Sequence, residues 1–180
     1  MITSRLILVV LLVLGLSGCK HELSRAERAK ALMREGNELL QQDSDLTSQW
    51  TAEYQKGFRP DVRAQFPGNR DVLRAHAEKI ISLLDESSGL SRRVAGKYEQ
   101  ASQLSDNDAE RRGVALIATS LKEGVVANQL YKSQMRLVSD EKITDQKTFE
   151  EKFKHYLDQI TQQRRESEEH YSQGKRLLGL

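Results

Sequence analysis

The chain has 180 residues and nearly balanced charge, with 28 Lys and Arg against 26 Asp and Glu. This balance excludes the strong basic field with which proteins attract nucleic acid. Hydrophobic residues make up 38% and charged residues 30% of the chain, and there are only two prolines; such a composition is typical of long helices with narrow apolar stripes. The single cysteine excludes an internal disulfide framework and a cysteine-based zinc site.

The first 19 residues have the pattern of an export signal. One positive charge, Arg5, precedes an unbroken apolar run, Leu6–Leu16, and the small residues Ser17 and Gly18 come before Cys19. The run is about half of the ~20 residues that a helix needs to cross a bilayer. It therefore predicts a signal peptide and not a spanning segment.

The segment Leu16-Ser17-Gly18-Cys19 resembles the bacterial lipobox, in which cleavage falls directly before the cysteine. The resemblance implies that residues 1–18 are a lipoprotein signal peptide that is removed, and that Cys19 receives a diacylglycerol and an N-acyl chain. Because each buried CH₂ contributes roughly 0.8 kcal/mol, two or three chains hold a protein on a membrane for long times. An ordinary signal peptide with an incidental cysteine is the alternative.

The residue after this cysteine bears on sorting. Some lipoproteins carry an Asp there that retains them in the inner membrane, whereas this chain has Lys20. The resemblance therefore favours the outer membrane, with the domain facing the periplasm. For residues 19–180 we find no resemblance to a known family.

Four segments of the mature chain carry apolar residues at steps of three and four, the spacing of one helix face. The first runs from Glu22 to about Lys56, and Asp43 interrupts its stripe. The second begins near Asn69, a good capping residue, and its stripe continues across Ser87–Gly89, which predicts one continuous helix to Leu104. The third and fourth lie on either side of a loop, Ser139–Asp145.

Each segment has about 35 residues, which is roughly 50 Å of helix at 1.5 Å per residue. Matched lengths and mostly short connections favour antiparallel neighbours. We therefore predict that residues 19–180 form one all-α, lipid-anchored domain, an elongated antiparallel up-down-up-down four-helix bundle. Its start, the turn around Asp106 and the C-terminus would share the membrane-near end.

The histidines lack the spacing of a metal or catalytic site. The residues three before His76, His155 and His170 are Leu73, Lys152 and Ser167, so the Glu-x-x-His motif of di-iron bundles is absent there. The sequence also has no Gly-rich phosphate loop and no Gly-x-Ser-x-Gly motif. We expect no catalytic residue, no metal and no cofactor, and we expect His76 and His170 to be buried or half-buried structural residues.

Small and polar residues interrupt the apolar stripes at Gly36, Asp43, Gly124, Asn128, Gln163, Ser167 and Gly174. We favour close helix approach at the glycines, with polar residues fixing the register at a cost in stability. The alternative is a cavity inside the bundle that holds a small ligand or a lipid. A defined pocket near Asn128 and Ser167 would favour the cavity, and a tightly packed seam would exclude it.

The Gly57–Gly68 loop is the most distinctive stretch of the mature chain. Aromatic side chains and arginine dominate binding hot spots, and the loop with its flank places them at Phe58, Arg59, Arg63, Phe66 and Arg70. These are the candidate partner-binding residues, at the end far from the membrane. Alternatively, Phe58 and Phe66 fold back and plug the open end of the bundle.

These observations together predict a non-catalytic structural or protein-interaction module of the bacterial cell envelope. Its expected partners are the membrane, through the lipid anchor, and an envelope protein; no nucleic acid is expected. The long helices are also compatible with a homodimer. The alternative function is a lipid- or small-ligand-binding helical bundle of the periplasm.

Overall fold

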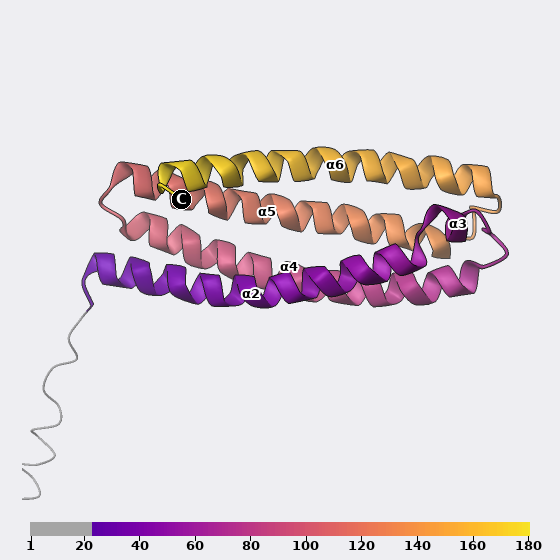
Figure 1. Cartoon of the computed structure of the whole chain (residues 1–180), viewed down its shortest axis with the longest axis horizontal. Coiled ribbons are helices and arrows are strands. Elements are labelled where there is room, and N and C mark those ends of the chain that lie inside the picture. Colours follow the sequence, from indigo (N-terminus) through magenta and orange to yellow (C-terminus); the bar gives the residue numbers. More distant parts are fainter. Residues whose placement is uncertain (1–22) are drawn as a thin grey trace, which may run out of the picture.

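The computed structural model describes residues 23–180; the signal peptide predicted for residues 1–18 and the lipidation predicted at Cys19 lie outside the described residues. Four long helices form the fold: α2 (Arg25–Gly57), α4 (Arg70–Leu104), α5 (Asp108–Arg136) and α6 (Gln146–Leu177). A one-turn helix, α3 (Pro60–Arg63), and a 3-10 helix, η1 (Leu137–Ser139), lie in the connections. They run up and down in turn (Figure 1), which confirms the predicted all-α four-helix bundle.

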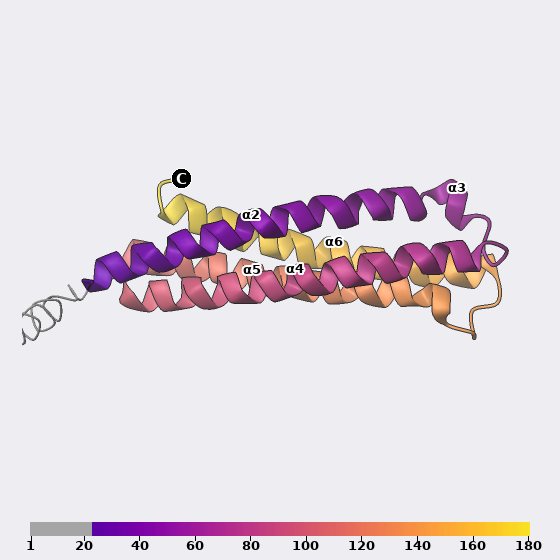
Figure 2. The ribbon, with the colours of Figure 1, turned by 90° about the horizontal axis from the view of Figure 1, so that it is seen from below.

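Consecutive long helices pack against each other: α2 on α4, α4 on α5, and α5 on α6. The start of α2, the α4–α5 turn and the C-terminus lie at one end, which we call the near end, and α3 and the α5–α6 connection lie at the far end (Figures 1 and 2). Among the described helices, α2 and α6 do not pack closely backbone to backbone. Side chains therefore decide what fills the seam between α2 and α6.

No helix within residues 23–180 is long and apolar enough to cross a bilayer. All four long helices instead carry one apolar face toward their neighbours, as the stripes in the sequence predict. The stripe of α4 is continuous through Ser87–Gly89, and so is the helix. The hydroxyl of Ser88 donates to the carbonyl of Leu84 at 2.6 Å, which pairs this buried polar group within its own helix.

Polar side chains cap the starts of α2 and α6, whereas the start of α4 differs from the expectation. Ser24 and Glu27 form a reciprocal capping box at the start of α2, and Asp145 accepts from the backbone N–H of Thr148 at the start of α6. Asn69 occupies the N-cap position of α4, as predicted, but its side chain does not cap the helix. Its amide donates to the carbonyl of Val62 at 2.7 Å instead, because α3 folds back beside the start of α4.

Aromatic rings fill the far end of the bundle. Phe58 stacks on Phe153 with ring centroids 5.9 Å apart and planes 12° apart. Phe66 stacks on Phe149 at 4.3 Å and 13°. All four rings are buried, so side chains of the Gly57–Gly68 loop plug the open end between α2 and α6.

Two tyrosines make the stability of the fold sensitive to high pH. Burial raises the pKa of Tyr54 and of Tyr98 to about 12, from an ordinary value near 10. Between these values the unfolded chain has released protons that the folded chain still holds. Below about pH 10 we therefore expect no effect of these groups on the free energy of unfolding. Above about pH 10 the free energy of unfolding should fall as the pH rises toward about 12.

Chemical denaturation at a series of alkaline pH values measures this effect. The Tyr98→Phe and Tyr54→Phe variants should each lose stability less steeply than the wild type above pH 10, because each lacks one of the ionising hydroxyls. Equal slopes for the wild type and both variants would contradict the burial argument.

Candidate functional site

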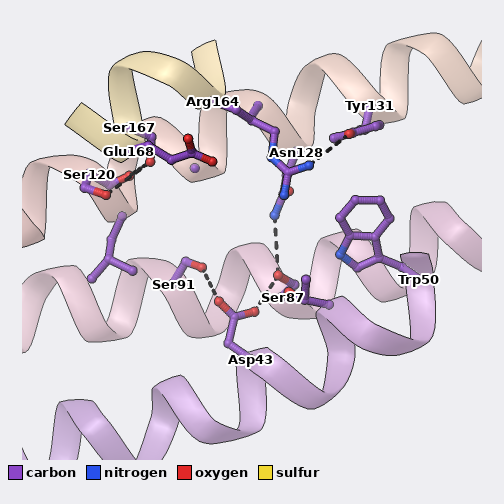
Figure 3. A pocket seen from close by; sticks show the side chains of 14 residues that line it. Asp43, Trp50, Ser87, Ser91, Ser120, Asn128, Tyr131, Arg164, Ser167 and Glu168 are labelled. Carbon is purple, nitrogen blue, oxygen red and sulfur yellow. Dashed lines mark hydrogen bonds between the residues drawn. The ribbon is translucent and has the colours of Figure 1, made fainter. Parts of the chain in front are cut away.

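A cavity of about 230 Å³ lies halfway along the bundle, in the seam between α2 and α6 (Figure 3). We call it the cleft. Side chains of α4 and α5 form its floor, and α2 and α6 form its two walls. Charged, amide and hydroxyl side chains make up most of its lining: Asp43, Thr47, Ser87, Ser91, Ser120, Asn128, Arg164, Ser167 and Glu168.

The cleft forms because the residues that face the seam at this height have side chains too small to fill it. Gly124 contributes no side chain to the floor, and a Cβ atom built on it would meet nothing within 4 Å. At Gly174, by contrast, a Cβ would lie 2.7 Å from the carbonyl oxygen of Gly113. Gly174 thus permits close helix approach, as expected, whereas Gly124 borders a cavity.

Asp43 interrupts the stripe of α2 because it belongs to a hydrogen-bond network across the floor. The hydroxyls of Ser87 and Ser91 donate to its two carboxylate oxygens at 2.5 and 2.7 Å. The amide of Asn128 in turn donates to the Ser87 hydroxyl at 3.4 Å. Asp43 is partly buried, and it forms no ion pair with any residue from 23 to 180.

Trp50 closes the far side of the cleft with a donor that lacks an acceptor. Its side chain is 4% exposed and packs on Tyr131 with ring centroids 4.9 Å apart. The indole Nε1 has no hydrogen-bond partner among the described residues, and in Figure 3 it lies on the side of the ring that faces Ser87 and Asn128. A buried donor without a partner costs about 1–3 kcal/mol of stability. A ligand in the cleft that accepts a hydrogen bond from this indole N–H would therefore be bound more tightly.

Hydrogen bonds to α5 hold the α6 wall of the cleft, which also carries charged groups. The Ser167 hydroxyl donates to the backbone carbonyl of Ser120 at 3.0 Å. One turn earlier on α6, Arg164 donates to the hydroxyl of Tyr131 at 3.3 Å. Glu168 is exposed beside them, so the wall presents a guanidinium and a carboxylate to a molecule that enters.

The five candidate partner-binding residues lie outside the cleft, and four of them are buried or partly buried in contacts within the chain. Phe58 and Phe66 are buried, at 2% and 3% exposed. Arg63 forms an ion pair with Glu150 at 3.1 Å, and Arg70 lies over the Phe66 ring at 4.7 Å. Arg59 alone among the five is exposed, where it pairs with Asp61 at 3.1 Å.

The seam histidines each face one carboxylate. Nδ1 of His76 lies 2.6 Å from Oε1 of Glu53, and Nδ1 of His170 lies 2.9 Å from Glu123. Both side chains are partly buried, as expected of structural histidines. Within residues 23–180, no group of three or more His, Cys, Asp or Glu side chains could hold a metal ion.

The residue pattern indicated only some of the side chains that line the cleft. Asp43, Gly124, Asn128 and Ser167 stood out as breaks in the stripes, but Trp50, Tyr131 and Arg164 looked like ordinary core or surface residues. The signal in the sequence was that Asp43, Asn128 and Ser167, on three different helices, fall at the same height of an up-down bundle. Comparison with protein-family models, with curated protein sequences and with solved structures found no match to this chain.

Proposed function

We propose that this chain is a non-catalytic lipoprotein of the bacterial cell envelope whose helical bundle binds a small polar ligand in the cleft. The observation that carries the binding proposal is the buried indole N–H of Trp50, which borders a cavity and has no acceptor among residues 23–180. The lipobox-like segment ending at Cys19 carries the anchoring proposal. The expected location is the outer membrane, with the bundle facing the periplasm.

The size and lining of the cleft favour a small and polar ligand over a lipid. Drug-sized ligands occupy pockets of roughly 300–1,000 Å³ lined mostly by apolar groups. The cleft is smaller, about 230 Å³, and serines, an amide and charged groups form much of its surface. A hydrocarbon chain placed there would separate these groups from water without pairing them, at a free-energy cost.

A protein-interaction role at the far end has less support from the geometry. Phe58, Phe66, Arg63 and Arg70, which would carry such a role, are occupied by contacts within the chain. We therefore assign the function to the cleft and not to the tip of the bundle.

Filling the cleft tests the binding proposal. The Gly124→Leu variant places a large side chain in the cavity, whereas Gly96→Leu adds the same side chain at another helical position with nothing within 4 Å of its Cβ. Native mass spectrometry of protein isolated from its cells should detect a bound small molecule in the wild type and in Gly96→Leu, and not in Gly124→Leu. A wild-type protein that carries no small molecule, or one that Gly124→Leu still carries, would refute the proposal.

Replacing the predicted lipidated residue tests the anchor. Cys19→Ser should remove the acyl chains and move nearly all of the protein from the membrane fraction to the soluble fraction, because the bundle then lacks its buried hydrocarbon. Ser17→Ala is the matched control, since it keeps a small residue before the cysteine. If Cys19→Ser protein still sediments with membranes and matures at the normal mass, the lipoprotein assignment is wrong.

A further inference from the structure

One side of the cleft is equipped to bind a cation. The carboxylate of Asp43 accepts two serine hydroxyls, and an ionised carboxylate has roughly four acceptor positions, so it retains capacity for another donor. No cation within residues 23–180 pairs with it, although it is partly buried. Glu168 adds a second carboxylate on the opposite wall.

The other side of the cleft is equipped to bind an acceptor. Trp50 and Arg164 approach the same tyrosine from opposite walls: the indole packs on the ring of Tyr131 at 4.9 Å, and the guanidinium donates to its hydroxyl at 3.3 Å. Arg164 forms no ion pair with the described part of the chain. A guanidinium and an indole N–H together form a donor set that suits a carboxylate.

The spacing of these groups limits the shape of the ligand. Asp43 and Trp50 lie seven residues apart on α2, which is about 10 Å along a helix axis. Hydrogen bonds of about 3 Å at each end leave several ångströms between the two charged groups of a ligand. A molecule whose opposite charges are separated by a few methylene groups meets this requirement.

We infer that the cleft binds a small zwitterion, whose amine contacts Asp43 and whose carboxylate contacts Trp50 and Arg164. This inference rests on the proposed function and specifies the chemical class of its ligand. A ligand with both charges neutralises Asp43 and Arg164 together and supplies the acceptor that the indole lacks.

Fluorescence titration of the lipidated full-length protein in a non-ionic detergent tests the inference. Trp50 is the single tryptophan of the chain, so its emission reports binding in the cleft directly. The probes are 4-aminobutanoate, which carries both charges about three methylene groups apart, butanoate, which lacks the amine, and butylamine, which lacks the carboxylate. We expect 4-aminobutanoate to bind about tenfold more tightly than either single-charge probe, because it alone makes both charged contacts.

Charge-removing variants identify which residue binds which end. Asp43→Asn should weaken the binding of 4-aminobutanoate about tenfold and leave the binding of butanoate unchanged. Arg164→Gln should weaken the binding of 4-aminobutanoate and leave the binding of butylamine unchanged. Asp45→Asn is the matched control, because Asp45 is an exposed residue of the same helix outside the cleft. Circular dichroism checks the fold of each variant. If Asp43→Asn does not fold, the exposed Arg164 decides: an Arg164→Gln protein that binds 4-aminobutanoate as tightly as the wild type overturns the zwitterion class.

The outcomes separate this inference from the proposed function. Equal affinity for the three probes, or full affinity in Asp43→Asn, overturns the zwitterion class. A third outcome also overturns the zwitterion class: none of the probes binds, although native mass spectrometry detects a bound molecule that Gly124→Leu loses. In that case the proposed binding function itself stands. The absence of any bound molecule from cells, together with no response to the probes, overturns both.

Discussion

Replacing Phe153 with alanine is expected to lower the free energy of unfolding by about 3–5 kcal/mol, the largest effect that we predict for a single substitution. Phe153 is 1% exposed. Its ring contacts those of Phe58 and Phe149, with centroids 5.9 and 5.7 Å away. The guanidinium of Arg63 covers the ring at 4.4 Å. Truncation would leave a cavity among stacked rings that cannot collapse without moving α2 against α6.

Urea denaturation followed by circular dichroism measures this change. The control is Leu157→Ala, one turn later on α6, where the side chain is 40% exposed. It should cost less than about 1 kcal/mol, since most of its surface already contacts water. A Phe153→Ala protein as stable as Leu157→Ala would mean that the far-end aromatic rings do not form a packed core.

Two glycine-to-alanine substitutions are expected to change stability in opposite directions. Gly174→Ala should lower the free energy of unfolding by about 1–3 kcal/mol, the usual cost of overpacking. The added methyl group would lie 2.7 Å from the carbonyl oxygen of Gly113 and 2.8 Å from Cγ1 of Ile117. Because the first contact is with backbone, relief requires α5 and α6 to separate.

Gly89→Ala makes the same chemical change in the middle of α4, where nothing lies within 4 Å of the new Cβ. It should raise the free energy of unfolding by about 0.5–1 kcal/mol, because alanine loses less backbone entropy than glycine in a helix. The two variants are compared by thermal and urea denaturation under identical conditions. A stabilising effect of both substitutions would show that α5 and α6 do not approach closely at Gly174.

The helices were predictable because their information is local. Apolar residues at steps of three and four define one buried face, and the stripe carried through Ser87–Gly89 despite the turn-like composition of that triplet. The antiparallel order followed from matched lengths and short connections. Asn69 marked the start of α4 correctly, but its side-chain partner depended on α3, which the stripe pattern does not describe.

The far-end loop illustrates a limit of composition. Aromatic and arginine side chains suit a binding surface, and they equally suit a plug in which Arg63 lies over a phenylalanine ring. Residue types alone do not distinguish these arrangements, because the same ring and guanidinium contacts stabilise both. The direction in which α3 folds back decides between them.

By itself the sequence determined the helices, their order and the export-signal pattern, since each depends on residues close together in the chain. Only the tertiary structure decided which interruptions of the stripes are contacts and which border a cavity. Gly174 and Gly124 are equivalent in the pattern, yet one meets the backbone of a neighbouring helix and the other meets open space. That difference depends on the distance between helices, which side chains far apart in sequence set together.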